Sequence, residues 1–504
     1  MQSINELPVE VLSRVFILGE NMQRGPRAIG LPYMGFQDLV VQVCHLWREV
    51  AISTPDLWTY IFISHPPPHL HAALYISRSG AFPLHIDLDM RTPFMRPIDP
   101  SRGKEQAERA LEALEFIEKA GGTRDRWGSL IIFSKALLAI ISIYSFFTRT
   151  PTPALRFVSI KWRAHDGTCD DQARLGAQKF RLDQMTLAHG PERPQLCHVE
   201  INGLPRFFTI NQRSALVSNL TRFTIIFSAT TSLPFHRGFS AIFSASPRLE
   251  HFSVDMRATL YSPVEIELGP ATISSLQVHL PLLRSFSPDT GHLYQWSLDL
   301  LRIMDAPGVE DFDINIERGF SDLTLTELHQ YLAKGRINGV LQCYVPPNDN
   351  ILGSGAIFPL LEHLNVKRMY RGVNNVSRIF AAFPMVTKVT FGGIGVLTLY
   401  EHPKYLPNAF HFTYIDEKFV KVPLVTGLLN NRAKHKVIST WVWCTDRSEE
   451  LCMQLHLETP GICHSGSDRH YHSLPELHVD HLIIRQVAKA FLHLGRSDDA
   501  VLAT

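Results

Sequence analysis

The sequence has almost no net charge. Its 504 residues include 49 lysines and arginines against 48 aspartates and glutamates, which leaves +1 at neutral pH. This balance gives no overall attraction to nucleic acid or to an anionic membrane, so we expect neither as a partner. The seven cysteines form no C-x-x-C pair, which predicts free or buried thiols in a reducing compartment. No basic segment followed by an apolar one opens the chain, which argues against secretion and favours the cytoplasm or nucleus.

Motifs of catalysis and cofactor binding are also missing. The sequence contains no GxxxxGK[ST] phosphate loop, no HExxH and no GxSxG. Histidines and cysteines gather between His435 and His481, but only Cys463-His464, His470-x-His472 and His478-x-x-His481 approach the tight ligand pairs of zinc sites. We therefore expect no metal, no cofactor and no enzymatic activity. The alternative, an enzyme, would most readily have its pocket around Cys463, His470 and His472.

Long apolar runs are scarce as well. Only residues 129–147, with Lys135 as their single charge, approach the length of a membrane span. Residues 130–133 predict a buried strand, and Ser134 is a candidate cap for a helix over 135–148. A strand followed by a helix cannot satisfy its backbone within lipid. With 45% hydrophobic and 19% charged residues, the chain is expected to be globular and not to enter a membrane.

What the sequence does contain begins with short helices near the amino terminus. Pro8 suits a first helical turn, and apolar residues follow at helical spacing as far as Leu18. A second helix is expected from Asp38, a candidate N-cap, and Thr54-Pro55 predicts a third that ends near Trp58. The residues expected on one side of the second helix are Leu39, Val43, Leu46, Trp47 and Val50. So small a unit buries little surface, and an apolar face left over is expected to dock on something else.

Three motifs in this region carry a resemblance to a known family. They are Leu7-Pro8-x-Glu10-x-Leu12-x-x-Val15-Phe16, Val43-Cys44-x-x-Trp47-Arg48 and Ser53-Thr54-Pro55-x-Leu57-Trp58. In this order they resemble the F-box signature, as found in the F-box-like proteins that are numerous in mushroom-forming fungi. The resemblance implies binding of a Skp-type adaptor and, through it, docking onto a cullin-RING ubiquitin ligase. The alternative is a small amphipathic unit that packs only on its own chain.

The resemblance also implies which residues form the adaptor interface or its immediate support. They are Leu7, Pro8, Val11, Leu12, Phe16, Val43, Cys44 and Trp47. The sequence alone does not divide them between contact with the adaptor and packing of the helices. The chain departs from the family pattern in an insert rich in glycine and proline, roughly residues 20–36, which we expect to form a surface loop.

A repeat begins near residue 127. Its rule is proline, any residue, apolar, two residues, apolar, one residue, apolar. Clear copies start at Pro153, Pro194, Pro247, Pro307, Pro359 and Pro384, and weaker ones include Leu220 and Pro281. This spacing resembles degenerate leucine-rich repeats, with one short strand per copy and a core closed by stacking. Helical pieces are expected between copies, over 298–304 and 325–332, and the long interval after Pro307 has room for one unrecognised unit. The alternative is scattered strands in a globular α/β protein.

These patterns predict an α/β fold: a small three-helix F-box unit followed by an irregular solenoid with a short parallel strand per repeat. The expected division is residues 1–64 for the F-box-like unit, 65–126 for a linker and the first units, 127–400 for the solenoid, and 401–504 for the last repeats and a cap. Within the linker region we expect a strand over 83–90, a proline-rich break over 93–103 and a helix over 105–120. In the last region we expect a strand over 438–443, a helix or strand over 449–457, an exposed loop over 465–472 and a helix over 480–494.

Strand geometry indicates a binding surface. Successive side chains point to opposite faces, so residues between the apolar positions are expected to line the concave face. The candidate substrate-binding residues are His198, Glu200, His251, Asp255, Asp311, Asp313, His363 and Lys367. Asp255, Asp311 and Asp313 give this face an acidic centre, which we expect to contact a basic or polar segment of a protein ligand. A merely solvated strand face is the alternative.

Taken with the resemblance, the sequence predicts a substrate-recognition subunit of an SCF-type ubiquitin ligase. The F-box unit is expected to bind the adaptor and the repeats an unidentified protein substrate. Thioester chemistry would belong to other subunits, and this protein would contribute proximity. The alternative function is a repeat scaffold that binds proteins without presenting them for ubiquitination.

Overall fold

The structure is a computed structural model that describes most of the first 455 residues. The described ranges are 4–23, 35–64, 67–91, 100–136, 152–162, 196–204, 218–227, 236–256, 268–289, 294–315, 322–342, 354–367, 376–392, 406–416, 440–445 and 448–455, with isolated positions between 138 and 146 and Leu399. Within them, no helix combines the length and apolarity that crossing a membrane requires. The loop expected over 465–472, the helix expected over 480–494 and most of the insert, residues 24–34, lie outside the described residues.

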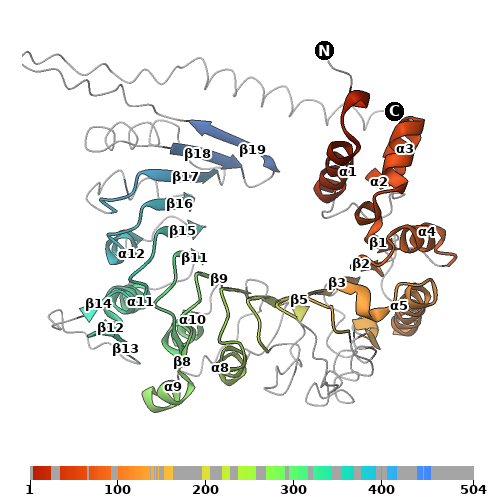
Figure 1. The fold of residues 1–504 in the computed structure, drawn as a ribbon. Coiled ribbons are helices and arrows are strands. Elements are labelled where there is room, and N and C mark those ends of the chain that lie inside the picture. Colours follow the sequence, from red (N-terminus) through yellow and green to blue (C-terminus); the bar gives the residue numbers. More distant parts are fainter. Residues whose placement is uncertain are drawn as a thin grey trace, which may run out of the picture.

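One curved sheet of 14 strands organises the described residues (Figure 1). Its strands follow chain order, and every neighbouring pair from β1 to β18 is parallel, while β18 and β19 are antiparallel. The strands are β1 (Tyr60–Ile63), β2 (Leu84–Asp89), β3 (Trp127–Ser134), β4 (Phe157–Trp162), β5 (His198–Leu204), β6 (Arg222–Phe227), β7 (His251–Asp255), β9 (Ser285–Asp289), β11 (Asp311–Asn315), β15 (His363–Lys367), β16 (Lys388–Gly392), β17 (His411–Asp416), β18 (Thr440–Thr445) and β19 (Ser448–Leu455). This arrangement confirms the predicted α/β solenoid.

The predicted repeats account for the central strands. The middle apolar residues of the predicted copies occupy one register row across the sheet, and Phe412 of β17 continues it. Every residue of this row is buried: Val158, Val199, Phe223, Phe252, Phe286, Phe312, Leu364, Val389 and Phe412. Aromatic rings stack along it, with centroids 5.6 Å apart for Phe252 and Phe286 and 5.8 Å apart for Phe286 and Phe312. A single repeat cannot bury such a row, so each strand depends on its neighbours.

A backbone ladder fixes the register at the amino edge of the sheet. The carbonyl of the residue before a strand accepts two N–H groups, one from the first residue of the next strand and one from the residue before it. For example, the Arg284 carbonyl accepts from Glu310 and Asp311 at 2.8 and 2.9 Å, and the Glu310 carbonyl accepts from Glu362 and His363, both at 2.9 Å. This repeated pairing gives hydrogen-bond partners to backbone groups that would otherwise have none where each strand begins.

Helices lie on the outer side of the arc (Figure 1). They include α8 (His236–Ala245), α9 (Pro270–Leu276), α10 (Tyr294–Ile303), α11 (Asp322–Lys334) and α12 (Val376–Ala382). Helices α10 and α11 confirm the helical pieces predicted over 298–304 and 325–332. Two small sheets accompany them, formed by β8 (Val278–His279) with β10 (Met304–Asp305) and by β12 (Arg336–Ile337), β13 (Val340–Leu341) and β14 (Ser354–Gly355).

The interval after Pro307 adds no strand to the main sheet. β11 pairs directly with β15 from Asp311↔His363 to Asn315↔Lys367. The room left open for an unrecognised repeat is instead occupied by α11 and the three-stranded sheet of β12, β13 and β14 among the described residues. The longer connection therefore thickens the outer layer.

The amino-terminal elements precede and cover the first strands. They are η1 (Ile4–Glu6), α1 (Val9–Gln23), α2 (Phe36–Val43), α3 (His45–Ile52), η2 (Pro55–Trp58), α4 (Leu70–Arg78), α5 (Pro100–Lys119) and η3 (Arg124–Arg126). The short helix predicted to end near Trp58 is confirmed as η2, with Thr54 at its N-cap and Pro55 opening it. The strand predicted over 83–90 is confirmed as β2. β1, within residues 1–64, is already the first strand of the sheet.

The expected second helix is wrong in two respects. It begins at Phe36, and Asp38 is its third residue, where the carboxylate accepts the Gly35 N–H at 3.1 Å instead of capping as the first residue. It also breaks at Cys44, whose extended backbone ends α2 and whose Sγ accepts the Trp47 N–H at the start of α3. Its five expected residues therefore do not share one side: Leu39 and Val43 are exposed, whereas Val50 is buried.

Two other boundaries differ from expectation. α5 starts at Pro100, inside the expected proline-rich break, because proline is compatible with a first helical turn. Residues 448–455 form a strand, β19, which decides between the helix and strand left open there. The predicted strand at 130–133 is confirmed within β3, and residues 138–140 are helical, in line with the helix expected after Ser134.

Candidate functional site

Helix α1 has two apolar stripes. Leu12 and Phe16 are fully buried, four residues apart on one face. A second stripe at spacings of four, three and four residues remains open: Val11, Val15, Leu18 and Met22 are 45%, 40%, 51% and 88% exposed. A helix that only covers its own core needs the first stripe alone. The second stripe is therefore surface that folding leaves unused.

The structure divides the residues that the resemblance placed at the adaptor interface. Leu12 and Phe16 belong to the core, and the Phe16 ring contacts the Trp47 ring with centroids 5.1 Å apart. Cys44 caps α3, so its role is to turn the backbone between helices. Val11, Val43 and Pro8 face outward, and Leu7 is half-buried beside them in the sequence.

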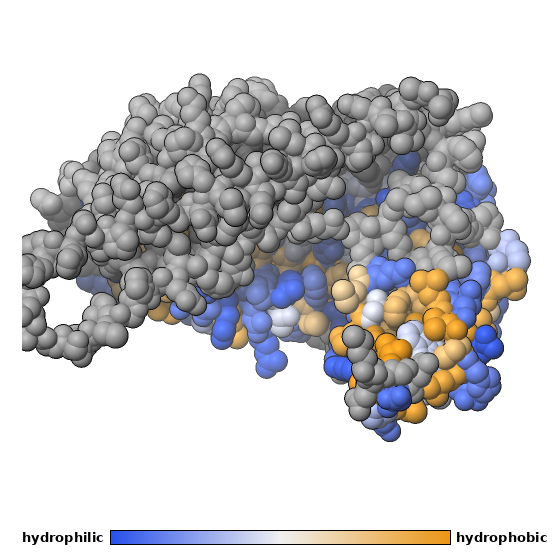
Figure 2. All heavy atoms as spheres, turned by 90° about the horizontal axis from the view of Figure 1, so that it is seen from above, coloured by the Kyte–Doolittle hydropathy of each residue, from blue (hydrophilic) through white to orange (hydrophobic). Residues whose placement is uncertain are grey.

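Many of the exposed apolar residues lie on the amino-terminal helices, at one end of the molecule. Helix α2 adds Leu39 and Val43, which lie four residues apart and are 45% and 58% exposed. Figure 2 shows apolar surface at the end that carries α1–α3, among hydrophilic residues. We call Val11, Val15, Leu18, Leu39 and Val43 the apolar ridge. An exposed apolar patch of this kind marks an interaction surface more often than a solvated one.

The helices that carry this ridge are joined firmly to the sheet. The Trp58 indole N–H donates to the Ala51 carbonyl at 2.8 Å, and its ring contacts that of Tyr75 at 5.3 Å. The Tyr75 hydroxyl donates to the Asp38 carboxylate at 2.6 Å, which ties α4 to α2. Arg78 lies over the Trp58 ring at 4.4 Å. One continuous apolar core runs from Leu12 through these residues into the strands.

Histidines recur in one register row of the concave face. We call this row the first concave row: Tyr60, His85, Ser129, Phe157, His198, Arg222, His251, Ser285, Asp311, His363, Lys388 and His411. Burial, and then Arg222 between them, lowers the pKa of both His198 and His251. Burial, and then Lys388, lowers the pKa of His411. These imidazoles are therefore held neutral at physiological pH.

The predicted acidic centre spans β7 to β11. Asp255, Asp311 and Asp313 lie in three different register rows of the sheet. A fourth carboxylate, Asp289, lies on β9 between β7 and β11, and it was not among the residues predicted from the sequence. The Asn315 side-chain amide donates from Nδ2 to Asp289 Oδ1 at 2.8 Å, and His363 Nδ1 lies 3.1 Å from Asp311 Oδ1. The signal for Asp289 was its position at the end of the weak copy that starts at Pro281, where the last apolar residue is replaced by Pro288.

The remaining candidates lie towards the ends of the face. Glu200 accepts from Ser159 at 2.9 Å and pairs with Lys161 at 3.5 Å, so its charge is already compensated. Lys367 occupies the last position of β15, opposite Asn315. The candidate residues therefore form one extended surface instead of a single converging site. Within the described residues, no group of three or more His, Cys, Asp or Glu side chains is placed to hold a metal ion.

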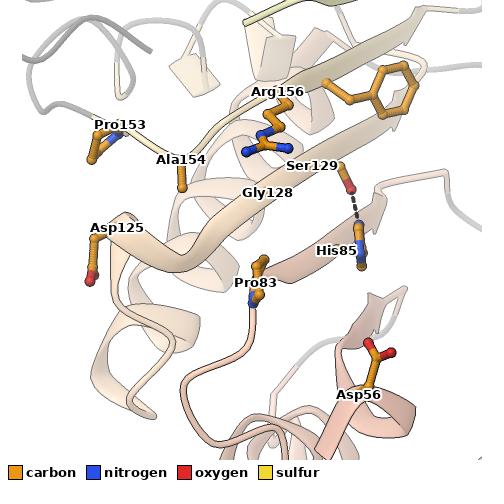
Figure 3. A pocket seen from close by; sticks show the side chains of 10 residues that line it. Asp56, Pro83, His85, Asp125, Gly128, Ser129, Pro153, Ala154 and Arg156 are labelled. Carbon is orange, nitrogen blue, oxygen red and sulfur yellow. Dashed lines mark hydrogen bonds between the residues drawn. The ribbon is translucent and has the colours of Figure 1, made fainter. Parts of the chain in front are cut away.

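A pocket opens where the helical unit meets the sheet. It has a volume of about 810 Å³. Asp56 of η2, Asp125 of η3, and Pro83 and His85 at the start of β2 line one part of it. The segments at the starts of β3 and β4 supply the other lining residues: Gly128, Ser129, Pro153, Ala154, Arg156 and Phe157. Figure 3 shows the His85 and Ser129 side chains joined across neighbouring strands, Nδ1 to Oγ at 2.8 Å. No sequence signal pointed to this pocket, because its walls come from four separate segments.

Comparison with known proteins adds no assignment. The chain matches no protein-family model, and no curated protein matches it in sequence.

Proposed function

We propose that this protein is the substrate-recognition subunit of an SCF-type cullin-RING ubiquitin ligase. Its apolar ridge would bind a Skp-type adaptor, and its concave face would bind a protein substrate. The observation that carries the proposal is the second, exposed stripe of α1, next to a buried stripe that already suffices to fold the helix. The resemblance of the first 64 residues to the F-box signature supplies the identity of the partner.

The ridge has the properties of a docking surface for a structured partner. Its members are aliphatic, and Trp58, Tyr75 and Asp38 hold their helices in place. A preorganised surface loses little conformational freedom when it binds, so more of the apolar burial appears as affinity. Each aliphatic side chain that becomes fully buried contributes about 1.5–3 kcal/mol.

Adaptor capture tests the ridge with a matched control. Val11→Asp with Val43→Asp places two charges on residues that are 45% and 58% exposed, so the fold should tolerate them. The control is Leu282→Asp with Leu360→Asp, at positions 47% and 60% exposed and far along the sheet. We expect the first pair to reduce capture of a purified Skp-type adaptor at least tenfold and the control to leave it unchanged. Equal capture by the two double variants would refute the adaptor role.

The substrate side of the proposal rests on the concave face. Its acidic centre (Asp255, Asp289, Asp311 and Asp313) favours a basic or polar segment of the substrate, because opposite charges steer and align an incoming polypeptide. Once a substrate has been identified by affinity capture, Asp311→Lys with Asp313→Lys should weaken its binding. Glu105→Lys with Glu112→Lys makes the same charge change at exposed positions of α5, away from the concave strands, and should not.

A change in the abundance of that substrate, dependent on the ubiquitin system, separates the proposal from its alternative. If a partner binds the concave face and the adaptor binds the ridge, but the partner's abundance never responds to blocking ubiquitination, the protein is a non-catalytic scaffold. In the proposed function the protein raises the local concentration of substrate lysines near a carrier enzyme and makes no bond itself.

A further inference from the structure

The pocket between η2 and the starts of β2–β4 has the size of a ligand site. Its volume of about 810 Å³ falls in the range of pockets that enclose a small molecule or a few residues of a peptide. It adjoins the first concave row at its amino-terminal end, where His85, Ser129 and Phe157 belong to both. A polypeptide that binds along the concave face can therefore extend into it.

The walls of this pocket are mainly apolar. Pro83, Pro153, Ala154 and Phe157 supply rigid or small surfaces against which aliphatic and aromatic groups can pack. Prolines and a short alanine side chain lose little conformational freedom on binding, so the walls are preorganised. This composition favours a ligand with apolar groups around whatever polar group it carries.

One cation in the pocket has no partner among the described residues. Arg156 is exposed, and its guanidinium makes no hydrogen bond and no ion pair with any of them; Figure 3 draws it near Ser129. Ser129 is itself largely buried and adds a hydroxyl at the same place. A guanidinium presents paired N–H donors that match the two oxygens of a carboxylate.

The pocket also limits how much negative charge it accepts. Asp125 and Asp56 stand well apart from each other and from Arg156 in Figure 3. Because two acidic side chains and one guanidinium line the pocket, the ligand must satisfy Arg156 without bringing a second negative charge towards Asp56 and Asp125. A dianionic phosphate is therefore disfavoured relative to a single carboxylate.

We infer that this pocket binds a protein segment in which one carboxylate, from an Asp or Glu residue or from the carboxyl terminus of the bound protein, is flanked by apolar residues. The carboxylate pairs with Arg156, and the flanking side chains pack on Pro83, Pro153, Ala154 and Phe157. The inference depends on the proposed function only in taking a protein substrate as the source of the segment.

Calorimetric titration of the full-length protein with short synthetic peptides tests this inference. The probes are acetyl-Ala-Phe-Glu-Phe-Ala-amide, the same peptide with glutamine or phosphoserine in place of glutamate, and acetyl-Ala-Phe-Phe with a free carboxylate. We expect the glutamate peptide or the peptide with the free carboxylate to bind at least tenfold more tightly than the glutamine and phosphoserine peptides, and the stronger of the two identifies the source of the carboxylate.

A pair of arginine variants locates the binding. Arg156→Met should weaken the preferred peptide at least tenfold. Arg284→Met is the matched control: Arg284 also directly precedes a strand, its carbonyl is in the same backbone ladder, and it lies outside the pocket. Absence of binding by every peptide at millimolar concentration would overturn the inference, as would equal binding by the Arg156→Met variant or by the glutamine peptide.

Adaptor capture by the same variants keeps the two proposals apart. Arg156 lies outside the apolar ridge, so Arg156→Met should capture adaptor as the unaltered protein does. Loss of peptide binding with adaptor capture retained supports the pocket. Peptide binding with no adaptor capture by the unaltered protein would refute the ligase function and leave the carboxylate site standing.

Discussion

Phe286 is one of the stacked rings in the aromatic part of the core, and its removal should be strongly destabilising. It is fully buried, with ring centroids of Phe252 and Phe312 at 5.6 and 5.8 Å on either side and Phe358 at 6.4 Å. Phe286→Ala removes a ring that no neighbour can replace, which costs about 3–5 kcal/mol in the free energy of unfolding. Part of this cost, about 0.5–1.5 kcal/mol for each ring pair, comes from aromatic geometry beyond burial.

Phe286→Leu is the matched variant. Leu364 occupies the same register row beyond Phe312, so a leucine side chain suits this row. The substitution keeps most of the apolar volume and should cost less than half as much as the alanine change. The difference in unfolding free energy between the two variants measures the cost of the cavity, separate from any general effect of mutation at this position.

Urea unfolding measures the difference. The slope of the free energy of unfolding with urea is about 3 kcal/mol per molar or more for a protein of this size, so Phe286→Ala should lower the midpoint by roughly 1 M. Trp296 is a suitable reporter, because its ring contacts Phe239 at 5.6 Å and Phe239 contacts Phe252 at 5.8 Å. Equal midpoints for the alanine and leucine variants would show that the stacked rings do not hold the repeats together.

Three further outcomes are expected. Folding lowers the pKa values of His198 and His251, so protonation of these histidines below about pH 6.5, their pKa in the unfolded chain, favours unfolding. The thermal midpoint should therefore drop between about pH 7.5 and 5.5. The drop should be smaller in a His198→Gln, His251→Gln double variant. Tyr75→Phe removes the hydroxyl bond to Asp38 and should cost about 1 kcal/mol by thermal unfolding. Gly19→Ala would push its new methyl group into the Phe36 ring at the start of α2, and faster proteolysis within the amino-terminal helices should reveal the displacement.

The repeat rule predicted the central strands because one physical requirement recurs at a fixed spacing. Each copy must place apolar side chains into a core shared with its neighbours, and the proline marks the turn before it. β17 obeys the same rule, with Pro407, Ala409 and Phe412 in the expected places, but Ala409 is a weak apolar signal and the copy was missed. β1 was missed because its residues had been included in the helical unit.

Local chemistry hid the break between α2 and α3. The apolar spacing continues across Cys44, and periodicity cannot register that a thiol accepts a backbone N–H and ends one helix while beginning the next. The division of the interface residues was equally hidden, since Val11 and Leu12 are both apolar, and only packing decides which is buried. The pocket depends on parallel register between segments far apart in the sequence, which no local pattern encodes.

Continuity of the core has a mechanical consequence for the proposed function. The apolar cluster passes from Leu12 and Phe16 through Trp58 into β1 and onward along the sheet, so packed side chains, and not a flexible connection, set the relation between ridge and concave face. With a flexible connection, the effective concentration of a bound substrate near the ligase would follow from linker length. Here that concentration follows from the curvature of the sheet and the number of strands between the ridge and the bound segment. A substrate held in the pocket beside η2 would therefore be presented at a different place from one held at the acidic centre, and the choice of site would determine which lysines are within reach.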